Sequence, residues 1–176
     1  SRLTTHEKHR ILALFQRRID ERVPAAYLTG EAWFAGLSFT SDARALVPRS
    51  PIAELIESGF EPWLGGREVR HALDLCTGSG CIAIAMGHYH PDWHVDGVDL
   101  SDDALALANE NKARLHADNV RFSKSDLFAG LSGEHYQLIV TNPPYVTNAE
   151  TDALPQEYSY EPEMGLRAGD DGLDLV

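Results

Sequence analysis

Hydrophobic residues recur along this chain with two different periods. In its first part the period is helical: Ile11, Phe15 and Ile19 share one face, and Thr4 and Glu7 have the spacing of a capping box. Short aromatic and apolar runs follow, separated by a glycine. The pattern predicts one amphipathic helix and then a pair of short strands.

From residue 69 onward, short apolar runs alternate with helical segments. Strands are expected at residues 69–76, 93–100, 119–123 and 136–140, and helices at 80–89 and 101–116. Alternation at this spacing predicts an α/β fold, in which a parallel sheet carries helices on both faces. In such sheets ligands bind outside the carboxyl ends of the strands, so the residues that follow each strand are the candidate ligand contacts.

The first two strand ends indicate a nucleotide-like ligand. The sequence "LDLCTGSGCIAIA" places Gly78 and Gly80 where a tight turn leads into a helix with free N–H groups. Asp99 ends the second strand 19 residues after Gly80, where a carboxylate can accept both hydroxyls of a ribose. The competing interpretation of Asp99 as a helix cap is weaker, because Ser101 already fills that position. An adenosine-type ligand is the better explanation.

The third strand end, "SKSDLF", offers a carboxylate and an apolar side chain to the same edge of the sheet. Asp126 could accept a hydrogen bond from an exocyclic amine, and Leu127 could cover a flat base. An ordinary turn aspartate would give the same pattern. At this point a nicotinamide-binding Rossmann domain and a methyltransferase that uses S-adenosylmethionine both remain open.

The sequence "TNPPYV" after the fourth strand favours the methyltransferase. Methyl transfer to an amide or aromatic amine needs two acceptors that hold the hydrogens of the nitrogen and orient its lone pair. The Asn142 side chain and the Pro143 carbonyl could supply them. Pro143 and Pro144 fix the corner, and Tyr145 can stack on the planar group. A strand-terminating turn is the alternative interpretation.

Charge and composition limit the partners. Lys and Arg total 15 against 27 Asp and Glu, a net charge of −12, of which residues 146–176 carry −7. DNA binding depends on neutralised phosphates, so we expect no direct contact with nucleic acid and rather a basic protein partner. The sequence predicts neither a membrane span nor a signal peptide, and its two cysteines favour the cytoplasm. No metal is expected, because Pro91 separates the histidines of "GHYHPDWH".

Taken together, "DLCTGSG", the Asp99 strand end, "SDLF" and "NPPYV" resemble the class I methyltransferases that modify the side-chain nitrogen of glutamine. The stretches "YLTGEAWFAGLSF" and "LVPRSPIAELI" extend the resemblance to members that act on a large-subunit ribosomal protein, whereas sister members act on peptide-chain release factors. The resemblance implies a site made of two sets of residues. The cofactor-binding set is Asp74, Cys76, Thr77, Gly78, Ser79, Gly80, Asp99, Leu100, Asp126, Leu127 and Asn142. The catalytic set is Asn142, Pro143, Pro144 and Tyr145, which would hold the glutamine amide.

The family's domain organisation implies three parts. Residues 1–24 would end a helical N-terminal domain, residues 25–50 would form a hairpin linker, and residues 51–176 would form a Rossmann-like S-adenosylmethionine domain. That domain has seven strands in the family, so we expect its last three strands to be absent from this chain. Two other functions stay open, a DNA amino-methyltransferase and a non-catalytic nucleotide-binding module. The first should carry a basic target-recognition region, and the second has no need for Asn142.

Overall fold

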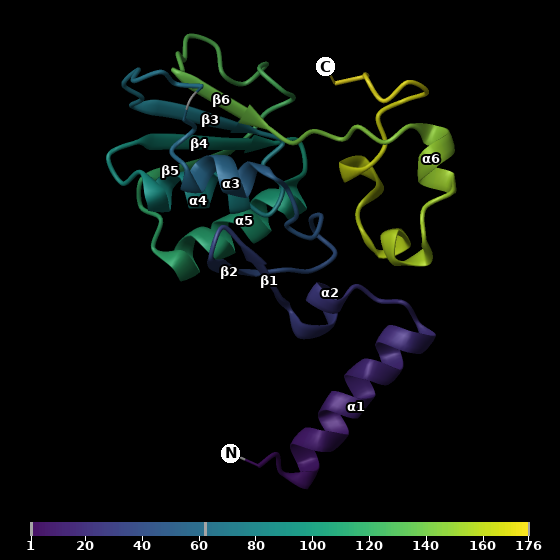
Figure 1. The fold of residues 1–176 in the computed structure, drawn as a ribbon. Coiled ribbons are helices and arrows are strands. Elements are labelled where there is room, and N and C mark those ends of the chain that lie inside the picture. The colour runs from purple at the N-terminus through teal and green to yellow at the C-terminus, as the bar shows by residue number, and fades with distance from the viewer. Residues whose placement is uncertain (1, 62, 176) are drawn as a thin grey trace.

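Four parallel strands form the centre of the structure, a computed structural model that describes residues 2–61 and 63–175 (Figure 1). They lie in the order β5-β4-β3-β6, and each neighbouring pair is parallel. Their bounds are β3 His71–Leu75, β4 His94–Asp99, β5 Val120–Lys124 and β6 Leu138–Thr141. The predicted parallel sheet of a Rossmann-like α/β fold is confirmed.

The other elements precede, connect or follow these strands. The helices are α1 Thr5–Asp20, α2 Ala25–Thr29, α3 Ile52–Glu57, α4 Cys81–Tyr89, α5 Asp102–Leu115 and α6 Asn148–Asp152. Two short 3-10 helices, η1 Gln156–Tyr160 and η2 Glu163–Gly165, lie near the end of the chain. The predicted hairpin is present as β1 Glu31–Phe34 and β2 Leu37–Thr40, which pair antiparallel.

Helices α3, α4 and α5 lie together on one face of the sheet (Figure 1). Helix α4 is apolar on all sides, and its residues 81–87 are buried. It packs in the core with Ala72, Val95 and Val120 from three neighbouring strands. A helix that has no polar face is expected to be buried on every side.

The opposite face of the sheet is covered differently. Leu73, Leu75 and Val98 pack there against Leu131 from the β5–β6 connection, whereas the Ile139 side chain is 48% exposed. The prediction of helices on both faces is therefore met on one face within the described residues. Along the part of the chain that the structure describes, β6 pairs with β3 and with no other strand.

The hairpin is attached to the sheet through a buried amide. Asn111 of α5 is fully buried; its Oδ1 accepts from Thr40 N at 2.7 Å, and its Nδ2 donates to Thr40 O at 3.2 Å and Ser79 O at 3.0 Å. One side chain thus ties the hairpin to the loop between β3 and α4. An unpaired amide at this depth would cost about 1–3 kcal/mol, so Asn111 fixes this junction.

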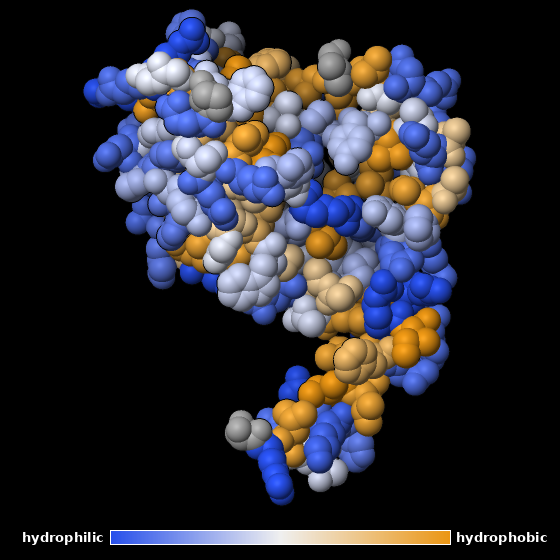
Figure 2. Space-filling view, in the orientation of Figure 1, coloured by the Kyte–Doolittle hydropathy of each residue, from blue (hydrophilic) through white to orange (hydrophobic). Residues whose placement is uncertain are grey.

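Helix α1 projects from the rest of the chain (Figure 1). The predicted capping box is present, since Thr4 Oγ1 accepts from Glu7 N and the Glu7 carboxylate accepts from Thr4 N. Hydrophobic side chains, including Phe15 and Ile19, are exposed along it, as Figure 2 shows. Its assignment to a helical N-terminal domain stays a prediction, and residues 1, 62 and 176 of the predicted domains lie outside the described residues.

No helix in residues 2–61 and 63–175 has both the length and the apolar character needed to cross a membrane.

Candidate active site

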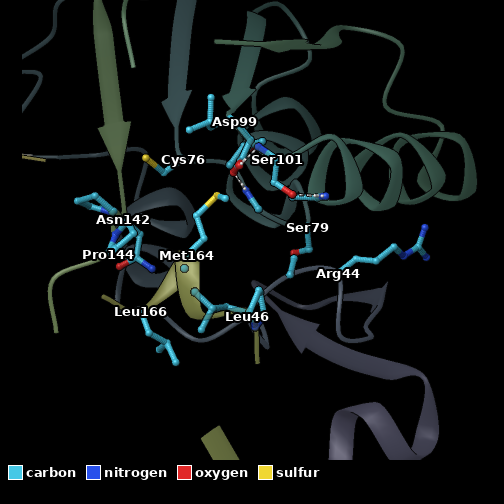
Figure 3. Close-up of a pocket in the computed structure, with 18 of the residues that line it drawn as sticks. Arg44, Leu46, Cys76, Ser79, Asp99, Ser101, Asn142, Pro144, Met164 and Leu166 are labelled. Atoms are coloured by element: carbon cyan, nitrogen blue, oxygen red, sulfur yellow. Dashed lines mark hydrogen bonds between the residues drawn. The ribbon is translucent and has the colours of Figure 1, made fainter. Parts of the chain in front are cut away.

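A cavity of about 610 Å³ lies at the carboxyl ends of the strands (Figure 3). The residues after β3, β4, β5 and β6 all contribute to it, as the sheet topology predicts. The predicted site residues that line it are Cys76, Thr77, Gly78, Ser79, Asp99, Leu100, Asp126, Leu127, Asn142, Pro143, Pro144 and Tyr145. The structure thus brings residues 66 positions apart in the sequence, Cys76 and Asn142, into one site.

The loop between β3 and α4 is held by backbone and carboxylate contacts. Thr77 N donates to Val98 O at 2.9 Å, and Gly78 N donates to Asp99 Oδ2 at 2.8 Å. The other Asp99 oxygen accepts from Ser101 N at 3.0 Å. A carboxylate has about four acceptor positions, so Asp99 can still receive hydrogen bonds from a ligand in the cavity.

Two residues predicted to bind the cofactor, Asp74 and Gly80, are not among those that line the cavity. The Asp74 carboxylate is fully buried beneath the loop, where its Oδ2 accepts from Thr77 Oγ1 at 2.5 Å and Ala83 N at 3.1 Å. Burial raises the pKa of Asp74 to about 7, against the opposing effect of the Thr77 and Ala83 hydrogen bonds. Gly80 packs against α5 and β5, where a methyl group would meet Phe122 at 2.7 Å. In this structure both residues hold the shape of the loop without lining the cavity.

Two non-glycine residues at the cavity have positive φ angles. Cys76 follows β3 with φ 60°, and Leu127 lies beyond β5 with φ 45°. Such conformations cost on the order of 1–3 kcal/mol each and occur preferentially at functional sites. Ser125 stabilises the second one, since its hydroxyl donates to Leu127 O at 2.6 Å. Burial raises the pKa of Cys76 to about 11, so its thiol is protonated at neutral pH.

The corner after β6 presents Asn142 to the cavity (Figure 3). Thr141 Oγ1 donates to Leu75 O at 3.0 Å and fixes the end of β6 against β3. Pro144 is buried, whereas the Tyr145 side chain is 65% exposed at the mouth. Beyond the corner, Val146 N donates to Leu166 O and Ala168 N donates to Val146 O, each at 3.0 Å.

Two further segments complete the cavity, and no residue of either was in the predicted site set. Residues 43–50 line one side, and Tyr158, Met164 and Leu166 come from the segment after α6. Figure 3 shows Leu46 and Leu166 on the side of the cavity away from Asp99, with Met164 between them. Neither segment follows a strand of the sheet, so the rule used to find the other site residues does not reach them.

Within the described residues, no three His, Cys, Asp or Glu side chains are grouped so as to hold a metal ion.

The sheet is Rossmann-like, and the cavity lies where such sheets bind their ligands. The chain belongs to the methyltransferase small domain family, which matches residues 62–158.

Three curated relatives match the whole chain, and each is named ribosomal protein uL3 glutamine methyltransferase. The relative from Xanthomonas campestris pv. campestris is 85% identical over 176 residues, and the match covers 57% of its length. One from Xylella fastidiosa is 76% identical with 56% covered, and one from Francisella tularensis is 51% identical with 57% covered. The chain therefore spans somewhat more than half the length of these relatives.

Solved structures confirm the fold. The catalytic domain of human METTL16 in complex with an RNA hairpin of the MAT2A 3′UTR has a TM-score of 0.63 at 20% identity, covering 98% of this chain and 60% of that one. The N-terminal domain of human METTL16 in complex with SAH has a TM-score of 0.52 at 22% identity, covering 81% of this chain and 54% of that one.

Proposed function

We propose that the protein carrying this chain transfers a methyl group from S-adenosylmethionine to the N5 nitrogen of a glutamine in ribosomal protein uL3. The observation that carries the proposal is the position of Asn142 at the same cavity as the glycine loop and Asp99. The names of relatives at 85%, 76% and 51% identity support uL3 as the substrate over a release factor.

The residues at the cavity fit the proposed cofactor. Asp99 would offer its remaining acceptor positions to the ribose, together with Leu100, and Asp126 and Leu127 would hold the adenine. Cys76, Thr77, Gly78 and Ser79 would hold the methionine end. Asp74 and Gly80 support that loop from below. The bound cofactor supplies an activated methyl group on a sulfonium centre.

The corner at Asn142 holds the acceptor amide. An amide nitrogen is a weak nucleophile because its lone pair is delocalised. The Asn142 side-chain oxygen and the Pro143 carbonyl accept its two hydrogens, which orients the lone pair toward the cofactor side of the cavity. Pro144 keeps the corner rigid and Tyr145 stacks on the planar amide. Orientation of this kind can contribute about 7–11 kcal/mol to lowering a barrier.

The charge of the chain suits a basic protein substrate. Residues 146–176 carry −7 of the net −12, next to the corner that holds Asn142. A ribosomal protein that binds RNA is basic while free. The acidic segment would therefore speed its association with the enzyme, at a rate that falls as the salt concentration rises. We place the reaction in the cytoplasm, before uL3 is covered by RNA, and we assign no direct role to nucleic acid or to a membrane.

One experiment tests the proposal. Full-length protein with methyl-labelled S-adenosylmethionine is offered free uL3, mature ribosomes, a release factor and duplex DNA in parallel. We expect label at one glutamine of free uL3 and much less on ribosomes. The Asn142→Ala variant should lose transfer while its affinity for S-adenosylhomocysteine stays within a few-fold. Preferential labelling of the release factor or of DNA would overturn the assignment, as would full activity of Asn142→Ala.

A further inference from the structure

A buried carboxylate joins the two segments that complete the cavity beyond the strand ends. The Glu161 side chain is 2% exposed, although glutamate is rarely buried without a partner. Its Oε1 contacts Arg49 Nη1 at 2.8 Å, and its Oε2 accepts from Arg49 Nη2 at 2.9 Å and from Val47 N at 3.1 Å. The pair is bidentate, which is the geometry that gives Arg–carboxylate contacts their directional strength.

Neighbouring contacts reinforce this junction from both sides. The Arg49 guanidinium lies 5.0 Å from the centroid of the Tyr158 ring, and Tyr27 OH donates to Ala45 O at 2.7 Å. Leu46 packs so closely on Gly165 that a methyl group on that glycine would meet Leu46 Cδ1 at 2.5 Å. Residues 45–50 and 158–166 are thereby held as one wall of the cavity, which we call the front wall.

The front wall is connected directly to the corner that presents Asn142. Leu166 and Ala168 form the two backbone hydrogen bonds with Val146, four residues after Asn142. Glu161 itself does not line the cavity. Its contacts therefore act on the site through the wall and the corner, while the glycine loop and Asp99 are held by separate hydrogen bonds.

We infer that Glu161 is a positioning residue for the protein substrate: through Arg49 and Val47 it sets the front wall against which the glutamine-bearing segment of uL3 binds. This inference rests on the proposed function. Because the hydrogen bonds that hold the glycine loop and Asp99 do not involve the wall, loss of the Glu161 pair should raise KM for uL3 without a matching change in cofactor affinity.

Glu157 offers a matched control four residues away. It too pairs with an arginine, since Arg18 Nη2 donates to its Oε1 at 2.9 Å, but that contact leads to α1 and not to the front wall. Glu161→Gln and Glu157→Gln each remove one negative charge from the same acidic segment. A difference in KM between the two variants therefore reports the contacts at the front wall and not the net charge of residues 146–176.

The test uses full-length protein, with S-adenosylhomocysteine as cofactor probe and free uL3 as substrate. We expect Glu161→Gln to raise KM for uL3 at least fivefold, with kcat and the affinity for S-adenosylhomocysteine within twofold of wild type. Glu157→Gln should change none of them by more than twofold. Arg49→Lys keeps the positive charge but loses the bidentate contact with Glu161. Its KM should lie between those of the wild type and Glu161→Gln. Equal KM values for the two glutamine variants, or a fall in kcat alone, would overturn the inference.

Amide hydrogen exchange tests the structural part of the inference, the junction at the front wall, without depending on the substrate. Glu161→Gln should accelerate exchange in residues 45–50 and 142–146 relative to Glu157→Gln, with no change in residues 76–80. Uniform acceleration over the whole chain, or none at the wall, would contradict the junction. Failure of the wild type to label uL3 would instead refute the proposed function, so the two failures are distinguishable.

Discussion

Gly78 and Gly80 lie in the same loop, yet alanine should affect them in different ways. Both have positive φ, 54° and 80°, so either substitution incurs the strain of a left-handed alanine, about 1–2 kcal/mol. At Gly78 the nearest side-chain atom to the new methyl group is Ala45 Cβ at 3.9 Å, an ordinary contact across the cavity. Strain alone should therefore decide the stability of Gly78→Ala.

At Gly80 the new methyl group has no room. It would meet Phe122 Cζ at 2.7 Å and Ala108 Cβ at 3.0 Å. The Phe122 ring cannot retreat, because a Cβ at Gly97 would meet its Cε1 at 2.5 Å, which shows that the ring is already packed closely on that side too. Overpacking adds about 1–3 kcal/mol, so Gly80→Ala should lose about 2–5 kcal/mol in all.

Urea denaturation of the two variants measures this difference, because the effect of alanine on the unfolded chain is the same in both. Calorimetry with S-adenosylhomocysteine should give the reverse order: Gly78→Ala narrows the cavity and should lose more affinity than Gly80→Ala. If Gly78→Ala were the less stable variant, the assignment of Gly80 to packing and Gly78 to the cavity would be refuted.

Three further predictions concern the buried acid, the ribose contact and the open strand. Burial raises the pKa of Asp74 in the folded state to about 7, well above the ordinary pKa of an aspartate. The folded state therefore holds a proton that the unfolded chain releases, and the contribution of Asp74 to stability falls as pH rises between the two pKa values. From pH 5.5 to 7.0 the stability of the wild type relative to Asp74→Asn, measured by urea denaturation, should therefore fall by about 1–2 kcal/mol; a constant difference would contradict the raised pKa. Asp99→Ala should weaken S-adenosylhomocysteine binding at least tenfold in calorimetry, because charge-assisted hydrogen bonds contribute about 1.5–3 kcal/mol each; unchanged affinity would rule out the ribose role. Residues 1–176 produced alone should self-associate in sedimentation and show no methyl transfer, since β6 has one free edge in the described structure; an active monomer would contradict this.

The sequence was sufficient to predict the sheet and the part of the cavity lining that follows its strands, because both follow from local pattern. Apolar runs locate the strands, and the topology of a parallel sheet brings the residues after each strand to one edge. The family resemblance placed Asp74 and Gly80 in the cofactor-binding set, and in this structure neither lines the cavity. A motif indicates which residues shape a turn, but not which side of the turn each residue faces.

Residues whose role depends on distant contacts could not be found in this way. Asn111 did carry a signal, since it stands on the same helical face as Ala104, Leu107 and Ala108, where a buried amide requires partners. Glu161 and Arg49 carried none. They are separated by 112 residues, and each has the ordinary setting of a surface charge in the sequence.

The same separation has a consequence for the order of folding. Residues 71–127 bring the glycine loop, Asp99 and Asp126 together through successive strand–helix units, with short stretches of chain between partners. The front wall forms when Glu161 meets Val47 and Arg49, which requires closing loops of 114 and 112 residues. Contacts of long sequence separation form later, because the entropy of loop closure is lost before they contribute. We therefore expect the half of the site that serves the nucleotide to be assembled first, and the half that admits a protein to be completed last.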